Sequence, residues 1–150
     1  SIILILKGDN IMKDSANLHL KVQELCDCYS TTDPLKEMSI LTKDQDEMDS
    51  DLKWLALLAL HGVNNNAKKI SIKQSEEGII SVKAEYRDSQ LPSPNADVAG
   101  NIFKAVKEIL HIEEAKGESI LALGIKDSSL DLNVSLKDKK GNKKITIKFP

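Results

Sequence analysis

Residues Asp51–Val63 read DLKWLALLALHGV, and every other element must be arranged around them. The segment carries five leucines and one tryptophan in thirteen positions, so as a helix it is apolar on nearly all sides. Carboxylates before it favour a helix start, and His61-Gly62 with the asparagines 64–66 end it. Such a helix cannot face water on any side. One side should pack on a sheet, and the other on N-terminal helices or a second protein chain.

Two helices are expected before this segment. One amphipathic stripe over about residues 14–30 is formed by Leu18, Val22, Leu25, Cys26 and Tyr29. Asp33 and Pro34 then supply an N-cap and a first helical residue for a second helix through Leu41. The acidic stretch 44–51 fails as a calcium loop because Met48 occupies a ligand position. We interpret it as a solvated helix start.

After residue 66 the pattern changes from helical spacing to alternation. Residues 69–73 and 80–86 alternate between apolar and polar and flank a turn, which predicts a hairpin with one apolar face. A helix over about 96–112 and strands near 120–125, 130–137 and 145–149 should follow. The segment 120–125 (ILALGI) is apolar on both faces, which is typical of a central strand.

The order α-β-β-α-β-β-β from residue 51 onward predicts an α+β fold. We expect a mostly antiparallel five-stranded sheet with helices on one face, in a module spanning 51–150 that follows a helical region at 12–50. Residues 1–11 are interpreted as foreign to the natural chain or as an upstream remnant, and as a strand if native. No signal-peptide pattern or long apolar run is present, so we expect a cytoplasmic protein with no membrane partner.

Composition and motifs argue against several classes of function. The chain has 150 residues, about one domain, with 21 basic and 23 acidic residues and the single arginine Arg87. Near-neutral charge disfavours a nucleic-acid coat, and the phosphate-binding G-x-x-x-x-G-K-[ST] and dinucleotide G-x-G-x-x-G motifs are absent. Cys26 and Cys28 point to opposite sides of a helix, and His61 and His111 fit helix ends. We therefore expect no cofactor, no metal and no catalytic residues.

The outward side of the predicted sheet is rich in lysine. It should hold two acidic side chains and six lysines, at positions Lys69, Lys73, Lys83, Lys137, Lys144 and Lys148. No aromatic side chain accompanies them to stack a nucleic base, so nucleic acid is a disfavoured partner. Such a face is either a solvated surface that discourages edge association or a docking surface for an acidic partner.

Taken with the all-round apolar helix, this face predicts a non-catalytic interaction or adaptor domain. We expect it to associate with itself or with a protein partner, through a surface formed by Trp54, Leu57, Leu58, Lys73, Lys83, Lys137, Lys144 and Lys148. An alternative hypothesis is a small-ligand-binding or enzymatic domain with a pocket between the sheet and helix 96–112. That alternative requires one cleft shared by Arg87, His111, Glu113 and Glu114.

Three segments of the module suggest a family. NAKKISI at 66–72 stands where that family has an A-S-D-I-H-I-E-like strand motif, and YRDS at 86–89 keeps the Arg and Asp of R-x-D-G but loses its glycine. GNKKITIK at 141–148 echoes a G-E-k-x-v-i-R-i strand, whereas 113–118 has no counterpart of P-Q-D-G-R. Over 51–149 the chain thereby resembles the α/β domain that precedes the motor core of type II secretion and type IV pilus assembly ATPases. The resemblance implies a docking or coupling module without ATPase machinery.

Overall fold

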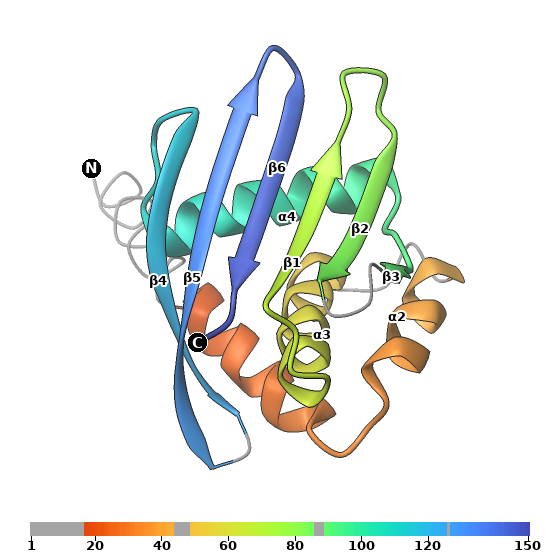
Figure 1. The fold of residues 1–150 in the computed structure, drawn as a ribbon, viewed down its shortest axis with the longest axis vertical. Helices are drawn as coiled ribbons and strands as arrows, with labels where there is room; N and C mark the ends of the chain where they lie inside the picture. Colours follow the sequence, from red (N-terminus) through yellow and green to blue (C-terminus); the bar gives the residue numbers. More distant parts are fainter. Residues whose placement is uncertain (1–16, 44–48, 86–88, 126) are drawn as a thin grey trace, which may run out of the picture.

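The computed structural model describes residues 17–43, 49–85, 89–125 and 127–150. Within them the chain folds into two layers, an antiparallel six-stranded sheet and a layer of helices on one of its faces (Figure 1). The expected α+β class is confirmed. Three features of the sequence lie outside the described residues: the segment 1–11, the acidic residues 44–48 and Arg87.

The described residues form four helices. The first spans residues 17–29, and the others are α2 (Pro34–Lys43), α3 (Ser50–Asn64) and α4 (Ala96–Leu110). α2 begins as expected, since the Asp33 carboxylate accepts a 3.1 Å hydrogen bond from the Leu35 backbone N–H. α4 begins in the same way, with the Asn95 side chain accepting a 2.8 Å bond from the Val98 N–H. Both helix starts are thus set by local side-chain chemistry.

The strands lie in the order β3-β2-β1-β6-β5-β4, and every neighbouring pair is antiparallel. Their bounds are β1 (Lys69–Gln74), β2 (Ile80–Glu85), β3 (Ser89–Leu91), β4 (Lys116–Ile125), β5 (Ser128–Lys139) and β6 (Asn142–Lys148). The predicted hairpin is β1–β2, and β6 returns to pair with β1 at the centre of the sheet (Figure 1).

Two expectations about the sheet were wrong. It has six strands rather than five, because the short strand β3 adds to the edge of β2. In addition, β4 is an edge strand and not a central one. Its outward residues are exposed, and the Ile120 side chain is 51% exposed. The solvent side of β4 thus carries an apolar residue. For this reason the β4 sequence has the apolar pattern of a strand that is buried on both faces.

Helix α3 is covered on all sides by the chain itself. Its residues from Trp54 to Gly62 are all buried. On the sheet side, Leu55 and Ala59 approach strand residues and α4. On the far side, the Cys26 thiol of helix 17–29 lies 4.0 Å from the Ala56 carbonyl oxygen, and α2 also packs on α3. The N-terminal helices thus supply the cover that the sequence required.

Side chains of helix 17–29 also cover part of the outer edge of β4. The Gln23 amide accepts a 2.6 Å hydrogen bond from the Gly124 N–H and donates a 2.8 Å bond to the Gly124 carbonyl. Next to it, the His19 Nε2 lies 2.7 Å from the Ala122 carbonyl oxygen. A glutamine side chain here takes the place of a neighbouring strand, which protects backbone groups that would otherwise be unpaired.

Replacing Gln23 with alanine is expected to weaken this edge. Loss of the two hydrogen bonds should cost about 1–2 kcal/mol in the free energy of unfolding, measured by urea denaturation. Hydrogen exchange of the Gly124 amide should become faster. Glu24→Ala, an exposed change on the same helix, is the control and should leave both quantities near their wild-type values. Unchanged exchange at Gly124 in Gln23→Ala would contradict this account.

Candidate functional site

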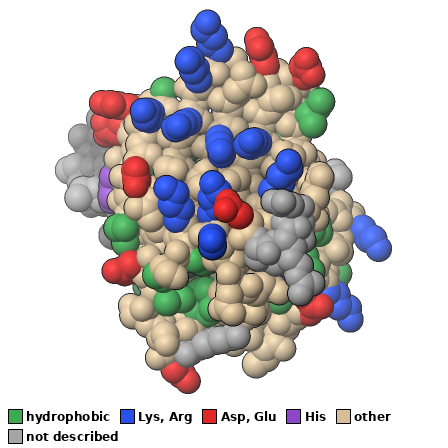
Figure 2. All heavy atoms as spheres, in the orientation of Figure 1, with side chains coloured by type: hydrophobic (Ala, Val, Ile, Leu, Met, Phe, Trp, Pro, Cys, Tyr) green, Lys and Arg blue, Asp and Glu red, His purple; other side chains and the backbone are tan. Residues whose placement is uncertain are grey.

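The outer face of the sheet carries a concentration of lysines, and the helices of the described residues lie on its other face (Figures 1 and 2). The strands alternate, so Ile70, Ile72, Ile145 and Ile147 are buried while their neighbours point outward. We use the name lysine surface for the outward lysines Lys69, Lys73, Lys83, Lys116, Lys137, Lys144 and Lys148. Five of them are lysines that the sequence analysis assigned to an interaction surface, and the structure places all five on this face.

The strand register aligns four of these lysines in one line. Lys73 of β1 lies opposite Lys144 of β6, and Lys144 lies opposite Lys137 of β5. Lys137 in turn lies opposite Lys116 of β4. We call these four residues the lysine row. It crosses four adjacent strands at right angles to their direction, with a like charge at every step.

This arrangement is unfavourable for the folded chain on its own. Like charges on directly opposite strand residues destabilise a sheet. The pKa of Lys144, which has a lysine on each side, is lowered first by partial burial and then by the charges of Lys73, Lys69 and Lys137. The lysine row thus places like charges side by side on four adjacent strands, an arrangement that costs stability.

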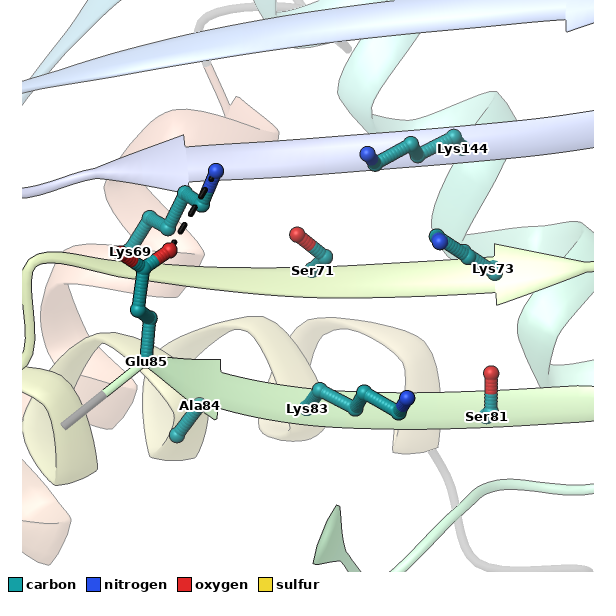
Figure 3. A pocket seen from close by; sticks show the side chains of 8 residues that line it. All are labelled: Lys69, Ser71, Lys73, Ser81, Lys83, Ala84, Glu85 and Lys144. Atoms are coloured by element: carbon teal, nitrogen blue, oxygen red, sulfur yellow. Dashed lines mark ion pairs between the residues drawn. The ribbon is translucent and has the colours of Figure 1, made fainter. Parts of the chain in front are cut away.

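A shallow hollow of about 190 Å³ lies beside the row, over β1, β2 and β6 (Figure 3). The Lys69 ammonium and the Glu85 carboxylate form a 3.3 Å ion pair at one end. Toward the other end the side chains of Lys73 and Lys144 extend over the sheet, with the Ser71 hydroxyl between these ends (Figure 3). Within the described residues, Lys69–Glu85 is the one ion pair on the lysine surface. Most ammonium groups of the lysine surface therefore remain available to an anion.

Small hydroxyl side chains form the next line across the sheet. Ser71 of β1 lies opposite Thr146 of β6, and Thr146 lies opposite Ser135 of β5. Lys83 flanks this line on β2 and Glu118 flanks it on β4. Short side chains leave the surface low between the longer lysines, and hydroxyls can donate hydrogen bonds to an anion.

The apolar part of the predicted interaction surface is corrected by the structure. Trp54 is 1% exposed, and Leu57 and Leu58 are fully buried. Because helix 17–29, α2 and the sheet already cover α3, these three side chains belong to the core and present nothing to a partner.

Among the described residues, the space between the sheet and α4 is packed rather than open. It is filled by apolar side chains around a void of about 10 Å³, which is at the lower limit for one water molecule. Of the residues expected to share a cleft there, Arg87 lies outside the described residues, and His111, Glu113 and Glu114 are exposed. His111 ends α4 with a left-handed backbone (φ 56°), as an end-of-helix residue does.

The other helix end that carries a histidine is buried. His61 is 2% exposed, and its Nδ1 lies 3.2 Å from the Asn65 side-chain nitrogen. Burial lowers the pKa of His61, and the nearby Asp33 charge opposes that shift. The imidazole is thus a packed group at the end of α3, in agreement with its expected role at a helix end.

The two cysteines differ sharply in environment. Burial raises the pKa of the Cys26 thiol to about 12, whereas Cys28 is exposed. Because the thiolate is the reactive form, a thiol reagent should modify one cysteine per folded chain and two after denaturation. Cys28→Ser should abolish the fast reaction, measured spectrophotometrically with a disulfide reagent. Rapid labelling of both thiols in the folded wild type would show that helix 17–29 does not cover Cys26.

Sequence reasoning missed Lys116. The strand was expected to start at residue 120, but β4 begins at Lys116 and continues through Gly117 and Glu118. The sequence carried no apolar alternation there, because residues 116–119 (KGES) are polar or glycine and resemble a turn. Lys69 was expected on this face and is found there, although its charge is partly neutralised by Glu85.

In its described residues the chain has an α+β fold with a basic sheet face on one side and helices on the other (Figures 1 and 2). Comparison with protein families and with curated proteins finds no match to this chain. In the parts of the chain that the structure describes, no helix is both long and apolar enough to span a membrane. Nor do these parts gather three acidic, histidine or cysteine side chains in a way that could hold a metal ion.

Proposed function

We propose that this protein is a non-catalytic binding module that docks an acidic segment of a partner protein on the lysine surface. The observation that carries the proposal is the alignment of Lys73, Lys144, Lys137 and Lys116 across four strands. Such a row costs stability when empty and gains from carboxylates placed along it. An acidic partner would therefore offset the repulsion between the lysine ammonium groups, which is present in the unbound protein.

The character of the lysine surface supports a protein partner over nucleic acid. No aromatic or arginine side chain stands among its described residues, so neither base stacking nor two-pronged contacts to phosphate or guanine are provided. No reaction is assigned to the surface, since Glu85, the carboxylate that lines the hollow, is held by Lys69.

The proposed function includes docking through lysines, as the sequence analysis expected. It does not include self-association through α3, because the side chains of α3 are buried within the chain. The resemblance to the domain that precedes secretion-ATPase motors implies the same kind of role, a docking or coupling module. We propose the cytoplasm as the compartment, where an exposed thiol such as Cys28 stays reduced.

The test measures binding of a fluorescent glutamate-rich peptide to the full chain by anisotropy. A variant with glutamine at Lys73, Lys83, Lys137 and Lys144 should bind at least about tenfold more weakly, since each lost charge contact costs up to about 1 kcal/mol. The matched control replaces four lysines of the helical layer, Lys36, Lys43, Lys104 and Lys107, and changes the net charge equally.

The control variant should bind within about twofold of the wild type at low salt. Added salt that shortens the electrostatic screening length from about 10 Å to about 3 Å should weaken binding of the peptide. Equal losses in the two variants would mean that only net charge matters and would overturn the proposal. Tighter binding of a single-stranded oligonucleotide than of the peptide would replace it with a nucleic-acid function.

A further inference from the structure

The lysine row has a spacing set by the sheet. Neighbouring strands lie about 4.8 Å apart, so four ammonium-bearing side chains stand at steps of about 4.8 Å over about 14 Å. Unlike lysines spread along one strand, which repeat at about 6.6 Å, these lie on a line perpendicular to the strands. The row therefore selects among acidic ligands by the spacing of their carboxylates.

Two regular forms of a peptide offer different spacings. On an α-helix, residues three or four apart lie on one face with their Cβ atoms about 5–6 Å apart. On an extended chain, residues on one face repeat every second position, at about 6.6 Å. The helical spacing is closer to that of the row. Four carboxylates at i, i+4, i+7 and i+11 on one helix face span about 16.5 Å, which is close to the length of the row.

We propose that the lysine surface binds an acidic α-helix that lies across the strands, with its carboxylates following Lys73, Lys144, Lys137 and Lys116. This inference rests on the proposed function and specifies the form and direction of the partner segment. The row of short side chains beside it, Ser71, Thr146 and Ser135, leaves the surface low where the helix backbone would lie. Helices of this chain occupy only the opposite face of the sheet, so the approach is open in the described part (Figure 1).

The line of residues beyond the hydroxyl line shows why one row dominates. Lys69 and Lys148 lie opposite each other, but Lys69 is bound to Glu85, and beyond Lys148 the line continues with Asn133 and Ile120. That line therefore has only two lysines, one of them paired with a carboxylate, and it ends with uncharged side chains. Only the lysine row offers four positive groups in sequence.

The experiment measures binding of two peptides of identical composition to the 150-residue chain. One has glutamates at i, i+4, i+7 and i+11 in an alanine-rich helical host, with its single proline at the first helical position, and the other has the glutamates at alternate positions with that proline at the centre. Helicity is checked by circular dichroism. Two triple variants with equal charge change are compared: Lys73, Lys116 and Lys137 to glutamine in the row, and Lys69, Lys83 and Lys148 to glutamine beside it.

We expect the helical peptide to bind about tenfold more tightly than its isomer. The row variant should lose that preference, whereas the variant beside the row should bind both peptides more weakly and keep the preference. All three lysines in each set are surface residues, and urea denaturation verifies that both variants fold. If both peptides bind the wild type equally, or if both variants lose the preference equally, the helix inference fails while the proposed function stands. If neither peptide binds in a salt-dependent manner, the proposed function fails as well.

Discussion

Leu58→Glu is expected to leave the protein unfolded rather than to dissociate an assembly. Leu58 is fully buried on α3, which the sheet covers on one side and the N-terminal helices on the other. Loss of the leucine costs about 2–5 kcal/mol, and burial of a carboxylate without a partner adds several more. The total is comparable to the entire stability of a typical domain, about 5–15 kcal/mol.

The measurement is far-UV and near-UV circular dichroism, with size-exclusion chromatography to follow the oligomeric state. Ile79→Glu is the control, because the Ile79 side chain is 64% exposed in the β1–β2 turn. It should change stability by less than about 0.5 kcal/mol. A Leu58→Glu variant that remained folded and became a smaller species would instead place α3 at an interface between chains.

The fold was predictable where apolar periodicity was strong. α3 and the β1–β2 hairpin were expected within one or two residues of their observed bounds. Leucines on every side of α3 indicate a buried helix, and the alternation around Ile70 and Ile72 indicates a strand with one buried face. β4 was misplaced because Ile120 is apolar on the solvent side, so pattern alone could not distinguish an edge from a centre. β3 is too short to show any pattern.

The candidate site was predictable only in part. Alternation was sufficient to place Lys73, Lys137 and Lys144 on one face. It could not align them, because sliding one strand by two residues preserves the face and destroys the row. Register depends on turns and on packing across the sheet, such as the positive-φ pair Lys140 and Gly141 between β5 and β6. The lysine row is therefore a property of the folded chain that its sequence does not display.

Lys144→Glu should stabilise the fold while it removes binding of acidic peptides. Lys144 stands between Lys73 and Lys137, so the change converts two like-charge pairs into two opposite-charge pairs. Each pair contributes about 0.2–1 kcal/mol, which predicts a gain of about 1 kcal/mol in the free energy of unfolding. Binding should fall by more than about tenfold, because a carboxylate then interrupts the row.

The pH dependence of stability gives a second test at Lys144, whose pKa is lowered first by partial burial and then by the neighbouring lysine charges. The pKa of Lys144 is lowered in the folded state, so above that lowered value the unfolded chain binds more protons than the folded chain. The contribution of Lys144 to the free energy of unfolding of the wild type should therefore rise as pH increases from the lowered pKa toward the ordinary pKa of lysine. The Lys144→Glu variant should lack this rise.

Lys104→Glu on the exposed side of α4 is the control for charge reversal, and it should neither stabilise the fold nor weaken binding. The gain from Lys144→Glu should shrink in about 1 M salt, where screening acts over about 3 Å. A Lys144→Glu variant that lost stability would show that the lysine row is not a source of repulsion. In that case the lysine row would not destabilise the unbound protein, and a partner would have no repulsion to offset. The proposed binding role would then lose its physical basis.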